Sequence, residues 1–522
     1  MKIKYINHIF IFFLFIYFIV VSILSLNTGI SHDEPHHFNV WLTNKKIYSN
    51  LLLGTNYEIV FRDFGENFYG IGFQIFSIPF ALLSEFILSN LNYFSANELI
   101  IKHPAIVFLF SISGFYFKKI IKLITNDEIF SFISAVFYLM YPYLLGHSLF
   151  NTLDIPFMSV WLICTFFIMK ISYLFFENFQ INYKDVVLLG LLTGFLLSIR
   201  ISGILIILEY IIFFLVTYNV TKYSISLFLK KNYKNIILFF VISLITFYLF
   251  HPNYWDNPLK IIDAIKFMGN HIQTVCTITL GDCMKAQSLP SSYIPIWFFF
   301  KLPIIILVGI FMFPLIEKKI FSNKLNVILL GSLSLSIFSI LFLLILLNVN
   351  LYDEIRHLLF LIPIIFIISF SFLYSISKKL FQSIIAIFIF FFIFQNIKIF
   401  PYNYLWLNNF SSFTNINSSF EKDYWGLSTR RISNFFNENS LGNECIISNR
   451  NKSIEAFVEN KNACFLNFRK LHQNNKRPFY VVLVERALRK GLPNNCKNIH
   501  NEIININFSK QDIIVAKIFK CT

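Results

Sequence analysis

Long apolar segments recur along most of the chain and stop near residue 400. A transmembrane helix needs about 20 consecutive, mostly apolar residues, and about eleven segments approach this length, with short polar connections between most of them. The segments cover residues 8–26, 101–117, 129–146, 155–173, 185–200, 201–217, 235–251, 294–316, 325–347, 357–377 and 381–400. This pattern predicts a mostly α-helical, polytopic membrane protein with about eleven transmembrane helices.

The composition supports the same fold class. Of the 522 residues, 56% are hydrophobic and only 14% are charged, which excludes an ordinary soluble protein. The net charge is +16, but most lysines form short clusters between apolar segments, as in cytoplasmic loops of membrane proteins. We therefore expect no nucleic-acid partner. The first segment resembles a signal peptide, but no small-residue cleavage site follows it before Asp33, so we expect an uncleaved helix.

The lysine clusters orient the predicted helices. If the N-terminus is cytoplasmic and residues 69–91 do not span, every dense cluster lies on the cytoplasmic side, as the positive-inside rule requires. The clusters are Lys118, Lys119 and Lys122; Lys222, Lys230, Lys231 and Lys234; Lys318, Lys319 and Lys324; and Lys378 and Lys379. Residues 69–91 are then expected to re-enter the membrane or to lie at its interface. The chain must also turn at Arg200, because one helix over residues 185–217 would invert the later half of the topology.

This orientation puts four regions outside the cytoplasm: a large loop at 27–100, a short loop around Asp154, a loop at 252–293, and everything after Pro401. We therefore expect a transmembrane domain over residues 1–400 and an external domain over residues 401–522.

The external domain has a different composition, polar and rich in Asn. Short β-like runs at 445–448, 479–484 and 513–519 predict a small soluble α/β domain. Six cysteines lie in predicted external segments, an even number that suits disulfides. They are Cys276, Cys283, Cys445, Cys464, Cys496 and Cys521. A bond between Cys276 and Cys283 is expected, the other four allow three connectivities, and free thiols remain the alternative.

Candidate chemistry begins just after the first apolar segment. Residues 31–37 read Ser-His-Asp-Glu-Pro-His-His and set Asp33 and Glu34 at the outer membrane surface. A carboxylate there can act as a general base whose neighbour tunes or orients it. The alternative is a polar helix start with Pro35 in its first turn. Asp154, in the loop before Pro156, is a second acidic candidate, and the alternative is that it only caps the next helix.

Several short motifs together resemble one family. The Asp-Glu pair follows the first helix, and a His-Ser-x-x-x-x-x-Asp-x-Pro loop at 147–156 lies near the fourth span. Residues 292–303 resemble a "Leu-Pro... Lys-Thr-Pro" stretch, residues 352–363 an "Arg-His... Pro" stretch, and residues 420–428 an Asp-Tyr-Trp-Gly segment. These features resemble bacterial members of the integral membrane GT-C glycosyltransferases, in the group of protein O-mannosyltransferases and aminoarabinose transferases. The resemblance covers most of residues 1–430 and nothing after them.

The resemblance implies an enzyme of the bacterial inner membrane that transfers a sugar from a polyprenyl-phosphate donor to a hydroxyl acceptor on the outer face. Asp33 would be the general base, Glu34 would orient it or the acceptor, and Asp154 would bind substrate or help to hold a metal. The acceptor would be a lipid, a protein or a polysaccharide.

The phosphate of such a donor requires cations near the membrane surface. The candidates at outer helix ends are Arg200, Lys301, Arg356 and His357. The alternative is that these side chains only snorkel toward water.

A divalent metal is a weaker hypothesis. His32, His36 and His37 beside the acidic pair have the ligand types of a transition-metal site, and His32 and His36 would share one face of a helix. Pro35 between them argues against a settled helix, so satisfied interfacial imidazoles are the alternative.

Two other functions remain open at this stage. A transporter or flippase is also polytopic, but it is expected to place ionisable groups near mid-bilayer and often to show repeated halves. A non-catalytic assembly factor for envelope polysaccharides could use the same external loops for binding.

Overall fold

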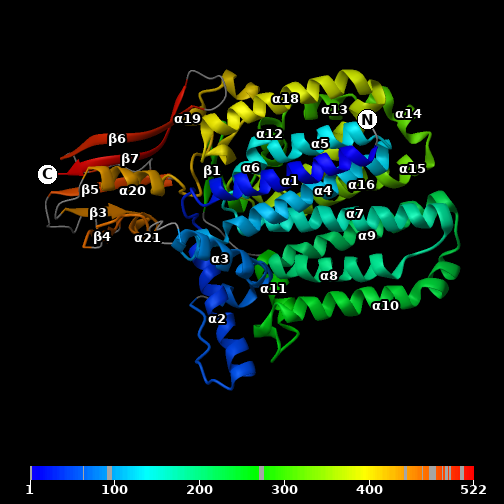
Figure 1. Ribbon diagram of the computed structural model, residues 1–522, viewed down its shortest axis with the longest axis horizontal. Helices are drawn as coiled ribbons and strands as arrows, with labels where there is room; N and C mark the ends of the chain where they lie inside the picture. Colours follow the sequence, from blue (N-terminus) through cyan, green and yellow to red (C-terminus); the bar gives the residue numbers. More distant parts are fainter. Residues whose placement is uncertain are drawn as a thin grey trace.

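The chain folds into a helical bundle with a small α/β region at one end (Figure 1). The structure is a computed structural model that describes residues 3–62, 64–90, 97–269, 275–439, 444–460, 462–468, 478–484, 486–487, 492, 495–505 and 511–521. The predicted fold class, a helical membrane protein with a small C-terminal α/β region, is confirmed.

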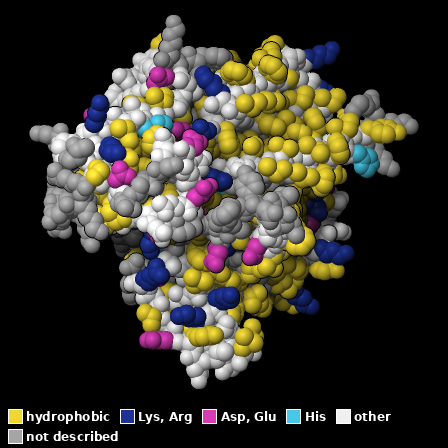
Figure 2. Space-filling model, turned by 60° about the vertical axis from the view of Figure 1, so that its left-hand side comes forward, with side chains coloured by type: hydrophobic (Ala, Val, Ile, Leu, Met, Phe, Trp, Pro, Cys, Tyr) yellow, Lys and Arg dark blue, Asp and Glu magenta, His cyan; other side chains and the backbone are white. Residues whose placement is uncertain are grey.

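Most helices of the bundle run along one direction (Figure 1). The first half of the bundle holds α1 (Ile3–Ser25), α4 (His103–Thr125), α5 (Glu128–Met140), α6 (Pro142–Ser148), α7 (Asp154–Asn178), α8 (Tyr183–Ile199), α9 (Ile206–Thr221) and α10 (Ile225–Leu249). The second half holds α12 (Tyr293–Lys301), α13 (Ile304–Phe311), α14 (Phe313–Phe321), α15 (Lys324–Asn326), α16 (Ser332–Leu346), α17 (Leu361–Ile376) and α18 (Lys378–Ile399). Phe390 and Ile397 of α18 are 76% and 75% exposed, and Figure 2 shows a broad area of hydrophobic side chains. A surface of this kind fits a lipid environment.

Eight of the described helices are long and apolar enough to cross a membrane, and up to ten spans result if each of two bent pairs counts once. The pair α5–α6 bends by 61° and the pair α12–α13 by 119°. Pro142 and Pro303 lie at these breaks, where a proline ring cannot continue the hydrogen-bond ladder. The sequence predicted about eleven spans because it also counted the segments that form α8 and α17. These two helices have only 17 and 16 residues, fewer than the about 20 that a span needs.

The helix α3 (Gly72–Asn90) forms over the stretch expected not to span. Its residues Gly72–Ser89 meet the length and composition of a membrane span. Gln74 in its first turn accepts a hydrogen bond of 2.9 Å from Lys102, next to the start of α4. That this stretch re-enters the membrane or lies at its interface instead of spanning it therefore stays a prediction, and Leu91 lies outside the described residues.

The chain does turn at Arg200, as predicted. Arg200 has an extended backbone with φ −145°, and the short helix η3 (Ile201–Leu205) follows it. Because α8 and α9 both pack against α7, the chain folds back here, and the single-helix alternative over residues 185–217 is wrong.

Lysines gather at the end of the bundle away from the C-terminal sheet. Lys118 near the end of α4 pairs with Glu128 at 2.8 Å, and Lys378 at the start of α18 pairs with Asp127. The N-terminus, α14 and α15 lie at the same end (Figure 1). The lysine clusters thus lie at one end of the bundle, as expected. The side of the membrane that this end faces stays a prediction.

The C-terminal region contains a five-stranded sheet in the order β4-β3-β5-β7-β6. The strands are β3 (Cys445–Ser448), β4 (Cys464–Asn467), β5 (Phe479–Val484), β6 (Cys496–Asn505) and β7 (Asp512–Cys521), with α19 (Ile416–Ser419), α20 (Thr429–Glu438) and α21 (Asn451–Glu455) beside or before them. The strands β3, β4 and β5 are parallel, and β7 is antiparallel to both β5 and β6. Disulfides Cys445–Cys464 and Cys496–Cys521 join each edge strand to its inner neighbour, which selects one of the three open connectivities.

Three further elements come from the loops predicted to be external. α2 (Glu34–Leu53) projects sideways from the bundle (Figure 1), and α11 (Lys260–Gly269) precedes a hairpin of β1 (Cys276–Thr279) and β2 (Asp282–Lys285). The predicted Cys276–Cys283 disulfide closes this hairpin. The argument that Pro35 opposes a settled helix is wrong, because Pro35 lies in the first turn of α2, where its missing N–H costs nothing.

Candidate functional site

Several segments far apart in sequence meet at the end of the bundle that faces the C-terminal region. Asp33 is the residue before α2, and its side chain does not cap that helix. Its carboxylate instead accepts a hydrogen bond of 2.8 Å from Nη1 of Arg356, in the short helix η7 (Arg356–Leu358). The Asp33 side chain is 30% exposed and that of Arg356 only 7%. The carboxylate therefore reaches solvent while its partner stays buried.

Charge keeps Asp33 ionised. Burial alone would raise the pKa of Asp33, but the positive charge of Arg356 and the nearby His37 outweigh it and hold this pKa below its usual value. Burial lowers the pKa of His37 to about 4, although Asp33 opposes this. Near neutral pH the site thus contains a carboxylate beside a neutral imidazole.

Aromatic rings hold the Arg356 guanidinium. It lies 4.7 Å from the ring centre of Tyr352 and 4.6 Å from that of Trp425. Burial would lower the pKa of Arg356, but Tyr352, Asp33, Asp353 and other acidic groups raise it well above its usual value. Arginine on an aromatic face is less hydrated and better ordered than a free surface charge.

Asp154 and Arg200 form a second ion pair in the same group. Asp154 lies in the first turn of α7, where the Asn151 amide donates to its carboxylate at 3.0 Å. Arg200 is at the break between α8 and η3. The positive charge of Arg200 helps to lower the pKa of His37, and the negative charge of Asp154 helps to raise the pKa of Arg356. The two ion pairs therefore belong to one electrostatic cluster.

Lys301 lies behind this cluster and is fully buried. Its ammonium contacts the carboxylate of Glu354 at 2.7 Å, with exposed fractions of 0% and 1%. It also donates to the Tyr404 carbonyl at 3.3 Å and lies over the ring of Tyr143. The positive charge of Lys301 is thus paired with a buried carboxylate inside the protein. Burial raises the pKa of Glu354 to about 7, although Lys301 opposes this.

Glu34 does not share the surroundings of Asp33. Its side chain is only 2% exposed and contacts Nε2 of His103 in α4 at 2.7 Å. Its other oxygen accepts from the Ser31 backbone N–H. Glu34 therefore fixes the start of α2 against α4.

The four candidate histidines do not come together at one point, although the rings of His36 and His37 lie 5.4 Å apart and both contact Tyr69. His32 contacts Arg450 of the C-terminal region, and His36 lies 3.7 Å from Glu66. The ring of His37 lies 5.4 Å from that of Tyr69, and His357 packs 4.7 Å from Tyr352. Among the described residues, no three His, Cys, Asp or Glu side chains form a group that could hold a metal ion.

The sequence reasoning missed four residues of this region: Asp353, Glu354, Trp425 and Arg486. The first three lie within motifs that were quoted for the family resemblance, so their motifs carried a signal that was not assigned to them. Arg486 lies in the terminal domain, where no motif pointed to it.

Comparisons with known proteins give a distant likeness. No family model matches the chain, and no curated protein matches it. Among solved structures it is similar to ArnT from Cupriavidus metallidurans bound to undecaprenyl phosphate, with a TM-score of 0.47 and 10% identity, and to the apo state of the same protein, with 0.46 and 12%. Each match covers 98% of this chain and 97% of the other. ArnT is a GT-C aminoarabinose transferase, in the group that the sequence motifs resemble. At these TM-scores the likeness adds no functional argument.

Proposed function

We propose that this protein is a membrane glycosyltransferase that moves a sugar from a polyprenyl-phosphate donor to a hydroxyl acceptor. The Asp33–Arg356 pair carries the proposal: an ionised, partly exposed carboxylate lies 2.8 Å from a buried guanidinium. A base and a phosphate-binding cation side by side are what inverting transfer from a phosphate leaving group requires.

In the proposed reaction Asp33 removes the proton of the acceptor hydroxyl. The acceptor oxygen bonds to the anomeric carbon as the bond from that carbon to the phosphate oxygen breaks, and the phosphate keeps the electron pair. The proton ends on Asp33. Arg356 has five N–H donors in a planar fork, so it can contact Asp33 and a phosphate oxygen together, and Arg200 adds positive charge beside it.

Asp154 and Glu34 have supporting roles in this proposal. Asp154 orients Arg200, with which it is paired. Glu34 fixes the first turn of α2 through His103, which sets where Asp33 lies. Lys301 acts on the site only through Glu354, and no metal is part of the proposed chemistry.

The position of the charges favours a transferase over a transporter. The Asp33, Asp154, Arg200 and Arg356 side chains lie at the ends of helices or in connections between them. Transporters tend to place coupling charges near the bilayer midplane. A lipid-linked donor has its phosphate at the membrane surface, which is where a cluster at helix ends would meet it.

The proposed setting is the outer face of a bacterial inner membrane, with the C-terminal region in the periplasm or outside the cell. The six disulfide-bonded cysteines support this setting, because disulfides persist in oxidising compartments. The acceptor would then be a lipid, a protein or a polysaccharide of the cell envelope.

The test is transfer of labelled sugar from polyprenyl-phosphate donors in membranes that contain the full chain. Asp33→Asn is expected to lower the rate by about 10²–10⁴-fold, the usual contribution of a general base. Glu438→Gln, which changes an exposed carboxylate of α20 to an amide, is the matched control. An Asp33→Asn protein that transferred sugar at the wild-type rate would refute the role of Asp33, and a wild-type protein inactive with every donor would favour a transporter or an assembly factor.

A further inference from the structure

The turn that leads into Arg356 has an unusual backbone. Asp353 and Glu354 have φ values of +56° and +65°, a left-handed conformation that non-glycine residues rarely adopt. Two consecutive residues of this kind persist only where the surroundings hold them. The turn is buried, with side chains 8% and 1% exposed.

Contacts from the helical bundle hold the Glu354 half of the turn. Tyr293 of α12 donates to the Glu354 carbonyl at 2.9 Å, and Lys301 of the same helix pairs with the Glu354 carboxylate. Tyr424 donates to that carboxylate at 3.2 Å. These contacts fix Glu354 without help from the C-terminal sheet.

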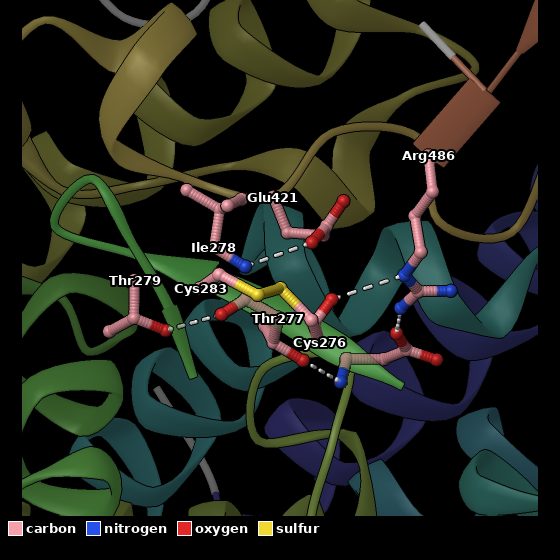
Figure 3. The surroundings of a disulfide bond; sticks show 8 residues. Cys276, Thr277, Ile278, Thr279, Cys283, Glu421 and Arg486 are labelled. Carbon is pink, nitrogen blue, oxygen red and sulfur yellow. Dashed lines mark hydrogen bonds and ion pairs between the residues drawn. A yellow bond between two sulfur atoms is a disulfide. The ribbon is translucent and has the colours of Figure 1, made fainter. Parts of the chain in front are cut away.

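The Asp353 half is held from outside the bundle, by Thr277 of the hairpin and by Arg486, and Figure 3 shows these two residues near the disulfide of the hairpin. The Asp353 N–H donates to Oγ1 of Thr277 in the disulfide-closed hairpin at 2.9 Å. Arg486, just beyond β5, forms an ion pair with the Asp353 carboxylate, and its Nε donates to the Cys276 carbonyl at 3.3 Å. One side chain of the C-terminal region thus joins the hairpin to the turn.

Charge balance explains why this contact matters for Arg356. The Asp353 carboxylate lies 3.5 Å from Nε of Arg356, and Asp33 lies 2.8 Å from Nη1 of the same guanidinium. Two carboxylates therefore face one arginine. Arg486 supplies the second positive charge on the Asp353 side, which leaves Arg356 available to Asp33.

We propose that Arg486 is a positioning residue of the transferase site: it neutralises Asp353 so that Arg356 serves Asp33 and the donor phosphate. The proposal rests on the proposed function. Without Arg486, the buried Asp353 has Arg356 as its nearest cation and draws the guanidinium toward itself. The C-terminal region is then part of the donor site and not only a cover over it.

The test uses the full-length protein in membranes and measures KM and kcat for labelled polyprenyl-phosphate sugar. Arg486→Gln is expected to raise KM about tenfold, within the range of coupled charge networks, with a smaller change in kcat. Arg486→Lys keeps the charge and is expected to recover most of this loss. Arg431→Gln, which removes another arginine of the C-terminal region, paired with Glu502 at 3.6 Å, is the matched control and should leave KM unchanged.

A second variant separates positioning from general damage to the fold. Asp353→Asn in the Arg486→Gln background removes the carboxylate that competes for Arg356, and asparagine tolerates a left-handed backbone. The double variant is expected to have a KM within about threefold of the wild-type value. Comparison of the single and double variants then measures the coupling between Arg486 and Asp353. Equal KM values for wild type and Arg486→Gln, or no recovery in the double variant, would overturn the role of Arg486 while the transferase proposal stands. A wild-type protein without transfer activity would overturn both.

Discussion

Replacement of Arg356 by glutamine should move the acidic limb of the pH–rate profile upward. The guanidinium lies 2.8 Å from the Asp33 carboxylate. Two unit charges about 4 Å apart interact by about 4 kcal/mol at an effective dielectric constant of about 20, which corresponds to about 3 pKa units. Because Asp33 is 30% exposed, screening reduces this to about 1–2 units.

The sign follows from the two states of the carboxyl. In the wild type the pKa of Asp33 is below its usual value, so the base is ionised above that pH and activity falls only as the pH drops through it. Without Arg356, burial dominates and the pKa of Asp33 rises. The acidic limb of kcat/KM should then lie about 1–2 pH units higher.

The assay is the sugar-transfer rate between about pH 2.5 and pH 8 at subsaturating donor, a range that extends below the usual pKa of a carboxyl. Arg356→Lys is the matched control, because it keeps the charge but loses the planar fork. It should lower the rate while leaving the acidic limb near its wild-type position. The reasoning is refuted if Arg356→Gln remains active with an unshifted acidic limb, since Asp33 would then not depend on this cation.

Two further predictions concern stability. Replacing Cys276 and Cys283 together by serine should destabilise the hairpin by about 2–3 kcal/mol, the loop-closure value for a separation of 7 residues. The measurement is hydrogen exchange over the hairpin, which should become faster. Unchanged exchange would contradict this prediction. Burial raises the pKa of Glu354 from 4.5 to about 7, so the stability that its protonated form contributes is fully present below pH 4.5 and is lost as the pH rises through 7. Glu354→Gln should flatten this slope in thermal unfolding followed from pH 4.5 to pH 8, and an unaltered slope would exclude Glu354 as its source.

Apolar segments predicted the helices well because membrane insertion imposes a minimum length of apolar sequence. The length of an apolar segment could not show that Pro142 and Pro303 each divide one of them, because the sequence is apolar on both sides of each break. In the terminal domain the inner strands β3, β5 and β7 were predicted. The edge strands β4 and β6 were not predicted. In β6 polar side chains interrupt the apolar pattern, as is common at sheet edges.

Residues of the candidate site could be selected from the sequence where a short motif contains them. Asp33 and Arg356 each lie in a short recognisable stretch, and the structure brings them within 2.8 Å of each other. The sequence could not show that Lys301 is used by Glu354, because their contact depends on how α12 packs against a left-handed turn. Nor could it show the contact between Arg486 and Asp353, which joins parts of the chain 133 residues apart.

The contact of Arg486 with the Asp353 turn also bears on the order in which the protein is made. Arg486 lies near the end of a 522-residue chain, whereas Asp33 lies near its start. Since domains fold as units while synthesis proceeds, the helices can insert long before the last strands emerge from the ribosome. The ion pair of Arg486 with Asp353 can form only after those strands have been made. A chain truncated before residue 486 would carry Asp33 and Arg356 but would lack the ion pair of Arg486 with Asp353, so under the proposed mechanism donor binding would require the C-terminal strands.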